Sequence, residues 1–554
     1  MRKLLIGLAL FLLLMAVILT VFGQNIRALF AASTTALGGE EASGSVAYGV
    51  HRKRIADFGS HDEDGFSNEP NWNTESYQHV ADNAFLSVAE HPLSTFSIDV
   101  DTASYSNVRR FLQRGQLPPK DAVRLEELVN YFKYKPIRPT AGVPLGAITE
   151  VAPCPWNPRH LLASVRVGTA PIENADLPAR NLVLLIDVSG SMDEPNKLPL
   201  VKAGVKLLVE TLKPTDRIAI VTYAAGTRIA LEPTSGAHRS QIAAAIDGLQ
   251  AGGGTNGAGG IQLAYELAHR NLVKGAINRV LLATDGDFNL GVTSQGDLQR
   301  LIESEREGGV YLTVLGFGMG NYKDSTLKTL AQYGNGNYAY IDTLKEAQKV
   351  LVSEAGATLV TVANDVKLQV EFNPAQVSSY RLLGYEGRIL RSDQFKDDKV
   401  DAGEIGAGQS VTAFYELVRA QDQAAAAEPK LKYQAPRQAS ASADTAELFN
   451  TKIRFKRPGS PESGLLEIPS SKPLETLRET SADFRFGAAV ASFGMLLRDS
   501  PHKGSFTYAD VLSLAQGATD GSDIRAEFLS LVESAPRGGS TAAARTGGAL
   551  NDWD

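Results

Sequence analysis

The chain of 554 residues has a single cysteine, Cys154, and only eight histidines. One cysteine cannot form an intramolecular disulfide, and it excludes a cysteine-rich zinc site. The sequence lacks a His-Glu-x-x-His pair and a Gly-x-x-x-x-Gly-Lys-Ser/Thr loop, the signatures of a zinc protease and of one class of nucleotide-binding protein. An excess of basic charge is also missing: 55 Lys and Arg face 62 Asp and Glu, a net charge of −7, so nucleic acid is not an expected partner.

A long hydrophobic run stands at the N-terminus. Arg2 and Lys3 precede an apolar run over residues 4–22, which is the pattern of an export signal. A run of this length just spans a hydrocarbon core of about 30 Å, so residues 1–23 are predicted to be a membrane anchor or, if cleaved before Gln24, a signal peptide. The remainder is then expected on the periplasmic side of the inner membrane, anchored or released. Because no cysteine follows the run, attachment through an N-terminal lipidated cysteine is excluded.

The centre of the chain alternates short β-branched runs with longer amphipathic segments, which is typical of βαβ units. The expected strands are nearly continuously apolar and cover 181–186, 217–222, 279–283 and 310–315. The expected helices cover 197–212, 240–249, 257–274, 295–307, 325–332 and 344–359. This pattern predicts an α/β domain with a doubly wound, mostly parallel sheet, and a site beyond the carboxyl ends of its strands.

Segments on both sides of this block have a different spacing of apolar residues. Residues 161–167, 366–372 and 411–418 alternate apolar with polar positions, as strands of a half-exposed antiparallel sheet do. We therefore expect the α/β domain to be inserted into, or flanked by, a β-sandwich with strands from 140–175 and 362–456. Helices are expected in the regions before and after it, at 103–114, 123–132, 482–497, 508–515 and 524–533.

These patterns divide the chain into successive parts. The expected order is a signal peptide or membrane anchor (1–23), a flexible linker (24–74), an N-terminal region with the first sandwich strands (75–180), the α/β domain (181–360), further sandwich strands with a linker at 419–445 (361–456), a C-terminal helical region (457–535) and a disordered tail (536–554). The linkers and the tail are rich in small and polar residues and could not bury a core.

Several polar residues outside the centre have a structural interpretation. Asp101 or Thr102 is expected to cap the helix that follows it, and Asp121 to precede the next helix. Ser325 and Lys328 fit a Ser-x-x-Lys pattern, but the companion motifs of that acyl-enzyme class are absent. We interpret Ser325 as a helix cap.

The strand at 181–186 delivers a set of oxygen atoms to the carboxyl edge of the sheet. Asp187, Ser189 and Ser191 alternate along the turn that follows, and Gly190 permits the chain to fold closely there. Alternate positions of a looping backbone direct their side chains to one point. Carboxylate and hydroxyl oxygens are the ligands that Mg²⁺ prefers.

Two further loops leave the same edge of the sheet. A glycine-rich loop at 252–254 carries Thr255, and the strand at 279–283 ends close to Asp285. Because neighbouring parallel strands end together, Thr255 and Asp285 are expected to complete the oxygen shell. The sequence thus predicts a metal site formed by three loops.

The segments DVSGSM, GGGTN and ATDGD resemble the metal-ion-dependent adhesion site of the von Willebrand factor type A domain. The resemblance implies that the hydroxyls of Ser189, Ser191 and Thr255 bind Mg²⁺ directly, with Mn²⁺ or Ca²⁺ as alternatives. It also implies that Asp187 and Asp285 hold the ion mostly through water.

A wider resemblance covers about residues 75–535. TFSIDVDTASY at 95–105 and ADFRF at 482–486 resemble segments of the bacterial YfbK-like family of exported proteins, which has no well-defined biochemical activity. Members of that family are often lipid-anchored, and this chain departs from them because it lacks a signal cysteine.

The predicted site favours binding over catalysis. Two carboxylates nearly neutralise a divalent ion, and neutral hydroxyls leave it electrophilic, so an Asp or Glu of a protein partner is the expected sixth ligand. We therefore predict a metal-dependent protein-binding module for adhesion or scaffolding in the cell envelope, without catalytic residues. A metal-dependent hydrolase, or an accessory subunit of an ATPase complex, remains the alternative.

Overall fold

The computed structural model describes residues 75–98, 101–172, 177–286, 295–320, 322–354, 360–398, 400, 402–422 and 440–536. The predicted anchor, the first linker, most of the second linker and nearly all of the tail lie outside these residues. Within the described part of the chain, no helix is both long and apolar enough to span a bilayer.

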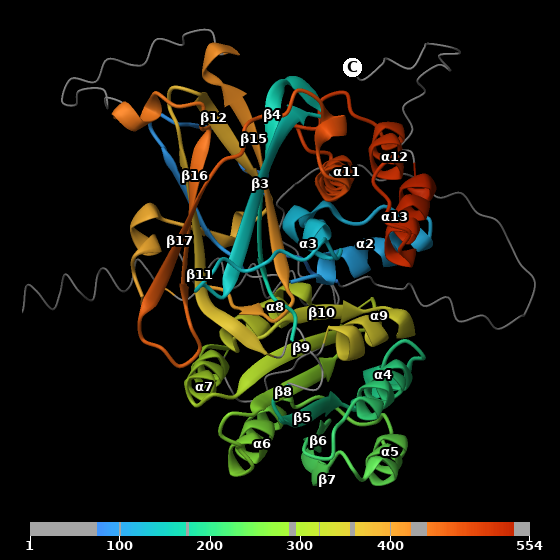
Figure 1. Cartoon of the computed structure of the whole chain (residues 1–554). Helices are drawn as coiled ribbons and strands as arrows, with labels where there is room; N and C mark the ends of the chain where they lie inside the picture. Colours follow the sequence, from blue (N-terminus) through green and yellow to red (C-terminus); the bar gives the residue numbers. More distant parts are fainter. Residues whose placement is uncertain are drawn as a thin grey trace, which may run out of the picture. The chain divides into compact units, whose positions relative to one another are not determined.

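The central domain is built on a six-stranded sheet with the order β10-β9-β8-β5-β6-β7 (Figure 1). Its strands are β5 (Arg180–Asp187), β6 (Arg217–Tyr223), β7 (Thr227–Ser235), β8 (Ile277–Thr284), β9 (Tyr311–Phe317) and β10 (Tyr338–Ile341). All neighbours are parallel except β7, which pairs with β6 in the antiparallel direction. The predicted doubly wound, mostly parallel sheet is confirmed.

Helices cover both faces of this sheet. One face packs against α6 (Gly257–Arg270), α7 (Gln295–Glu307) and α8 (Asp324–Tyr333), and the other against α4 (Leu198–Glu210), α5 (Arg239–Asp247) and α9 (Leu344–Gln348). In β5, Val183 and Leu185 enter the first core while Leu184 and Ile186 enter the second, so the strand is buried on both sides. The last helix is shorter than predicted: α9 ends at Gln348 and continues as a π-helix over Lys349–Ser353, and residues 355–359 are outside the described part.

Two antiparallel sheets form a sandwich. Their orders are β1-β12-β15-β4-β3 and β13-β2-β11-β16-β17, with β14 paired to β11. The strands are β1 (Leu86–Ser87), β2 (Leu93–Ser97), β3 (Leu145–Cys154), β4 (Asn157–Thr169), β11 (Thr361–Phe372), β12 (Val377–Leu383), β13 (Ile389–Leu390), β14 (Ile405–Gly406), β15 (Ser410–Arg419), β16 (Phe449–Lys456) and β17 (Ser463–Pro469). Val165 on β4 and Val370 on β11 belong to the core that the two sheets share. Since β4 and β11 flank the central domain in sequence, that domain is inserted between strands of the sandwich.

The sandwich takes strands from places where the sequence analysis expected none. β17 lies in the region 457–535 that was predicted to be helical, and β2 precedes the N-terminal helices. β17 forms a hairpin with β16. The exposed Leu465 interrupts the alternation of apolar and polar residues that would have predicted this strand. The predicted linker 419–445 is also too long at its start, because Arg419 is the last residue of β15.

Five helices share one core with the outer face of the five-stranded sheet. They are α2 (Ala103–Gln113), α3 (Leu125–Asn130), α11 (Ala482–Arg498), α12 (Tyr508–Gln516) and α13 (Asp523–Ser534). Their core includes Cys154, Leu162 and Phe414 from the strands beneath. Cys154 is buried in this core, and burial raises the pKa of its thiol well above the usual range.

Candidate functional site

Three loops meet at the carboxyl edge of the central sheet. Asp187 ends β5, and the neighbouring strand β8 is followed by Asp285. The glycine-rich loop joins the first loop through two backbone hydrogen bonds: the Gly190 amide donates to the Gly253 carbonyl at 3.0 Å, and the Gly252 amide donates to the Val188 carbonyl at 2.8 Å. The structure therefore brings the three predicted segments to one place.

The polar side chains of the first loop are linked to one another. One Asp187 oxygen accepts the Ser189 amide at 2.8 Å, and the other accepts the Thr284 hydroxyl at 3.2 Å. The hydroxyls of Ser189 and Ser191 are 3.1 Å apart. Asp187 is fully buried and Ser191 is exposed, so the set runs from the sheet edge outward to solvent.

Thr255 lies in the glycine-rich loop that is bonded to the first loop. It is half-buried and stands one residue before Asn256, the N-cap of α6, whose side chain accepts the Gly259 amide. The cap places the loop at the start of a helix that packs on the sheet. Thr255 is held beside the other loops by the backbone bonds of Gly252 and Gly253.

The electrostatics of Asp187 favour a cation. Burial raises the pKa of the Asp187 carboxyl above its usual range, and the charge of Asp285 raises it further. Hydrogen bonds from Ser189 and Tyr223 lower the pKa but do not offset the increase. Two buried carboxylates with hydroxyls beside them suit a divalent ion such as Mg²⁺, which would supply the missing positive charge.

Lys197 belongs to this site and was missed by the sequence analysis. Its ammonium donates to the Ser191 carbonyl at 2.9 Å and to an Asp285 carboxylate oxygen at 3.2 Å. The residue is the N-cap of α4, where its positive charge opposes the helix dipole. That unfavourable position, six residues after Ser191, was the signal available in the sequence.

The other acidic residues nearby do not join the set. Asp193 is exposed in a short 3₁₀ helix, Gly190–Asp193, and Glu194 forms an ion pair with Lys197 at 3.3 Å. Asp287 lies outside the described residues. In the described part of the chain, no three His, Cys, Asp or Glu side chains are grouped to hold a metal. The candidate site is of another kind, with two carboxylates and three hydroxyls.

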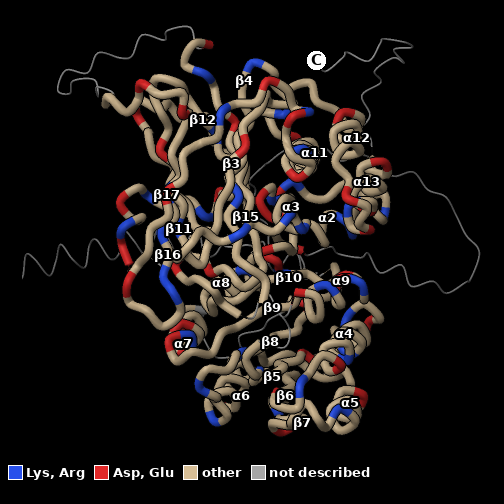
Figure 2. Tube along the Cα trace, in the orientation of Figure 1, with Lys and Arg blue, Asp and Glu red and all other residues tan. Residues whose placement is uncertain are grey.

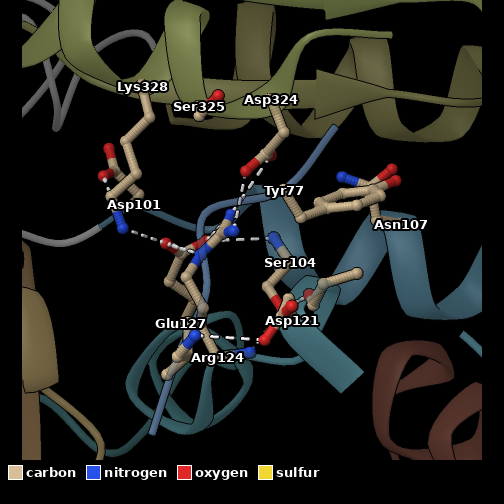
Figure 3. Close-up of polar contacts among 12 residues, drawn as sticks. Tyr77, Asp101, Ser104, Asn107, Asp121, Arg124, Glu127, Asp324, Ser325 and Lys328 are labelled. Carbon is tan, nitrogen blue, oxygen red and sulfur yellow. Dashed lines mark hydrogen bonds and ion pairs between the residues drawn. The ribbon is translucent and has the colours of Figure 1, made fainter. Parts of the chain in front are cut away.

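A second concentration of buried charge lies between the N-terminal helices and α8 (Figure 3). Arg124 donates to Asp324 at 2.7 Å and also pairs with Glu127, which accepts the Lys328 ammonium at 2.8 Å. Glu127 further accepts the Ser104 amide at 3.0 Å. These contacts join α3 to α8 and hold the central domain against the helical layer.

The structure also tests the structural interpretations of Asp101, Asp121 and Ser325. Of the two residues predicted to cap α2, Thr102 stands at the N-cap position but makes no side-chain capping hydrogen bond. The Asp101 carboxylate instead accepts the Tyr338 amide at 3.1 Å and pairs with Arg388 at 3.0 Å. Asp121 precedes α3, as predicted; it lies in a 3₁₀ turn and accepts the Val80 amide at 3.1 Å.

The interpretation of Ser325 as a cap is also wrong, since Lys323 is the N-cap of α8 and Ser325 is its second residue. Lys328 reaches away from Ser325 toward Asp101 and Glu127 (Figure 3). The Ser-x-x-Lys pattern therefore has no nucleophile and base in contact.

Charge over the rest of the described chain is mixed. Lys and Arg are interspersed with Asp and Glu on the strands and helices, in both the sandwich and the central domain (Figure 2). The charge balance within the candidate site is thus more informative about function than the net charge of the whole chain.

Comparison with known proteins agrees with this architecture. A model of the von Willebrand factor type A domain matches residues 181–353, a von Willebrand factor model matches 71–164, and a model of the C-terminal part of the uncharacterized protein YfbK matches 357–537. The uncharacterized protein YfbK of Escherichia coli is 47% identical over 469 residues, which cover 83% of this chain and 81% of that protein. The chain belongs to the YfbK-like family of von Willebrand factor type A domain proteins. Domains of this type often take part in protein–protein interaction.

Other relatives are less similar in sequence. The human inter-alpha-trypsin inhibitor heavy chain H4 is 29% identical over 147 residues, 25% of this YfbK-like chain and 16% of that protein. Among solved structures, a von Willebrand factor type A protein from Catenulispora acidiphila is 15% identical, with a TM-score of 0.39 over 70% of this chain and 88% of that chain. Proximal thread matrix protein 1 from the mussel byssus, described with a zinc-occupied adhesion-site motif, is 23% identical, with a TM-score of 0.26 over 32% and 46%. The fold assignment rests on the strand order described above.

Proposed function

We propose that the chain is a metal-ion-dependent protein-binding module of the bacterial cell envelope. The observation that carries the proposal is the convergence of two buried carboxylates, Asp187 and Asp285, with an exposed hydroxyl, Ser191, at one edge of the sheet. A cation bound there would be reachable from solvent. The partner that suits it is a protein that presents an Asp or Glu side chain.

The residues have distinct roles in this proposal. The hydroxyls of Ser189, Ser191 and Thr255 would bind Mg²⁺, with Mn²⁺ or Ca²⁺ as alternatives, while Asp187 and Asp285 hold it mostly through water. Bound there, the ion supplies an electrophilic position that prefers an anionic oxygen. Partner binding and metal binding are then thermodynamically linked. A bound ion raises the affinity for the partner, and a bound partner raises the affinity for the ion.

The envelope location and the non-catalytic role belong to the same proposal. The location is supported by the charged and apolar N-terminal pattern, which directs the chain across the inner membrane as an anchored or released protein. We assign the site no catalytic role because the neighbouring cation, Lys197, is paired with Asp285 and Glu194 and is not poised as a base.

A capture experiment tests this function. The purified chain is crosslinked to envelope membranes in millimolar Mg²⁺ or in EDTA, and captured proteins are identified. We expect a partner that is captured in Mg²⁺, is lost in EDTA and is lost when membrane carboxyl groups are first amidated.

The matched variants are Asp187→Ala, which removes the buried carboxylate, and Asp193→Ala, which removes an exposed one in the same loop. Capture should be lost in the first and kept in the second. Equal capture in EDTA and by Asp187→Ala would contradict the proposal.

A further inference from the structure

The candidate site already contains a cation of the protein's own. The side chain of Lys197 is 4% exposed, and its ammonium lies 3.2 Å from an Asp285 oxygen and 2.9 Å from the Ser191 carbonyl. A Glu194 carboxylate oxygen lies 3.3 Å from the same ammonium, and the Glu194 side chain is half-exposed at the outer rim of the site. The buried charge without a metal is therefore −1, the sum of two carboxylates and one ammonium.

Packing fixes the lysine in this position. Gly318, just after β9, has a φ of +77°, and a Cβ there would lie 2.5 Å from the Lys197 Cε. The aliphatic stem of Lys197 thus lies directly against the backbone of Gly318. A side chain at position 318 would displace this stem. Lysine at the N-cap of α4 gains nothing from the helix dipole, so its contacts with the site explain its position better than helix stability does.

Resting on the proposed function, we infer that Lys197 sets the metal affinity of the site and couples metal retention to the arrival of an anionic partner. Without a metal, the ammonium neutralises Asp285 and keeps the loops folded. With a divalent ion, it repels the ion and leaves the site with a net charge of +1. A partner carboxylate restores neutrality, so the ion is held weakly alone and firmly in the complex.

The effect of Lys197 on metal affinity is tested with Mn²⁺ alone on the purified full chain, by calorimetric titration. Lys197→Met keeps the aliphatic stem on Gly318 and removes the charge, and we expect it to bind Mn²⁺ about tenfold more tightly than the unmodified chain. Lys197→Arg keeps the charge and should bind no more tightly than the unmodified chain. Glu194→Gln removes the rim partner of the lysine and is the control for a change at the loop surface.

A second measurement separates this role from simple packing. In EDTA, Lys197→Met should unfold at a lower urea concentration, because the buried carboxylate of Asp285 loses its ion pair with Lys197, and added Mn²⁺ should restore the midpoint. Lys197→Gln provides the same comparison if the methionine variant does not fold.

Equal or weaker Mn²⁺ binding by both neutral variants, with binding intact in the unmodified chain, would overturn the role of Lys197 and leave the metal site standing. Absence of saturable binding in the unmodified chain and in every variant would overturn the metal site as well.

Discussion

Replacing Asp187 with alanine is expected to lower Mg²⁺ affinity by about 10- to 100-fold, the usual effect of losing a group that holds a metal through an outer shell. Asp187 is fully buried, and its carboxyl is the group whose pKa is raised by burial and by Asp285. Isothermal titration of the purified chain measures the affinity directly. Asp193→Ala should bind Mg²⁺ as the unmodified chain does.

The same variant should behave differently without metal. A buried carboxylate destabilises the folded state when nearby positive charge does not balance it. Removal of Asp187 should therefore leave the free energy of unfolding in EDTA unchanged or higher. Loss of affinity together with an intact metal-free fold would show that Asp187 serves the ion and not the scaffold. A variant that unfolds in EDTA would contradict this assignment.

Replacing Arg124 with alanine is expected to lower the free energy of unfolding by about 3–5 kcal/mol, because the buried carboxylate of Asp324 loses its ion-pair partner and Glu127 keeps only Lys328. Both carboxylates are almost completely inaccessible, and they come from the helical layer and from α8. Urea unfolding, followed by far-ultraviolet circular dichroism, measures the change.

A matched control separates burial from charge pairing. Arg391 pairs with Asp393 at 3.1 Å, but both side chains are at least 70% exposed, so Arg391→Ala should leave the free energy of unfolding nearly unchanged. The double variant Arg124→Met with Asp324→Leu should be more stable than Arg124→Ala, since it leaves one fewer unpaired buried charge. A loss below 1 kcal/mol for Arg124→Ala would show that this network does not stabilise the junction.

The parallel sheet was predictable because its strands carry a strong, local signal. β5, β6, β8 and β9 are nearly continuous apolar runs, and each lies within two residues of its predicted bounds. β7 was missed because it is an edge strand with exposed polar residues and a proline, Pro233, near its end. The short sandwich strands β1 and β13 are two residues long and are defined by pairing with distant strands, which no local pattern reveals.

The candidate site was predictable where it depended on strand ends, and less so where it depended on tertiary packing. Asp187 and Asp285 follow buried parallel strands, so their proximity follows from topology alone. Lys197 reaches the site from the start of α4, and its direction is set by contact with Gly318, more than a hundred residues later in the chain. The partners of Asp101 are equally remote, which is why a capping role was predicted for a residue that joins domains.

The most direct test of the metal site is anomalous diffraction from crystals of the protein soaked in Mn²⁺. The account predicts one strong peak within about 2.0–2.3 Å of the hydroxyl oxygens of Ser189, Ser191 and Thr255, and a weaker peak in crystals of Asp187→Ala soaked at the same, sub-saturating Mn²⁺ concentration. A crystal whose site stays empty at saturating Mn²⁺, or whose peak lies away from these three hydroxyls, would contradict it.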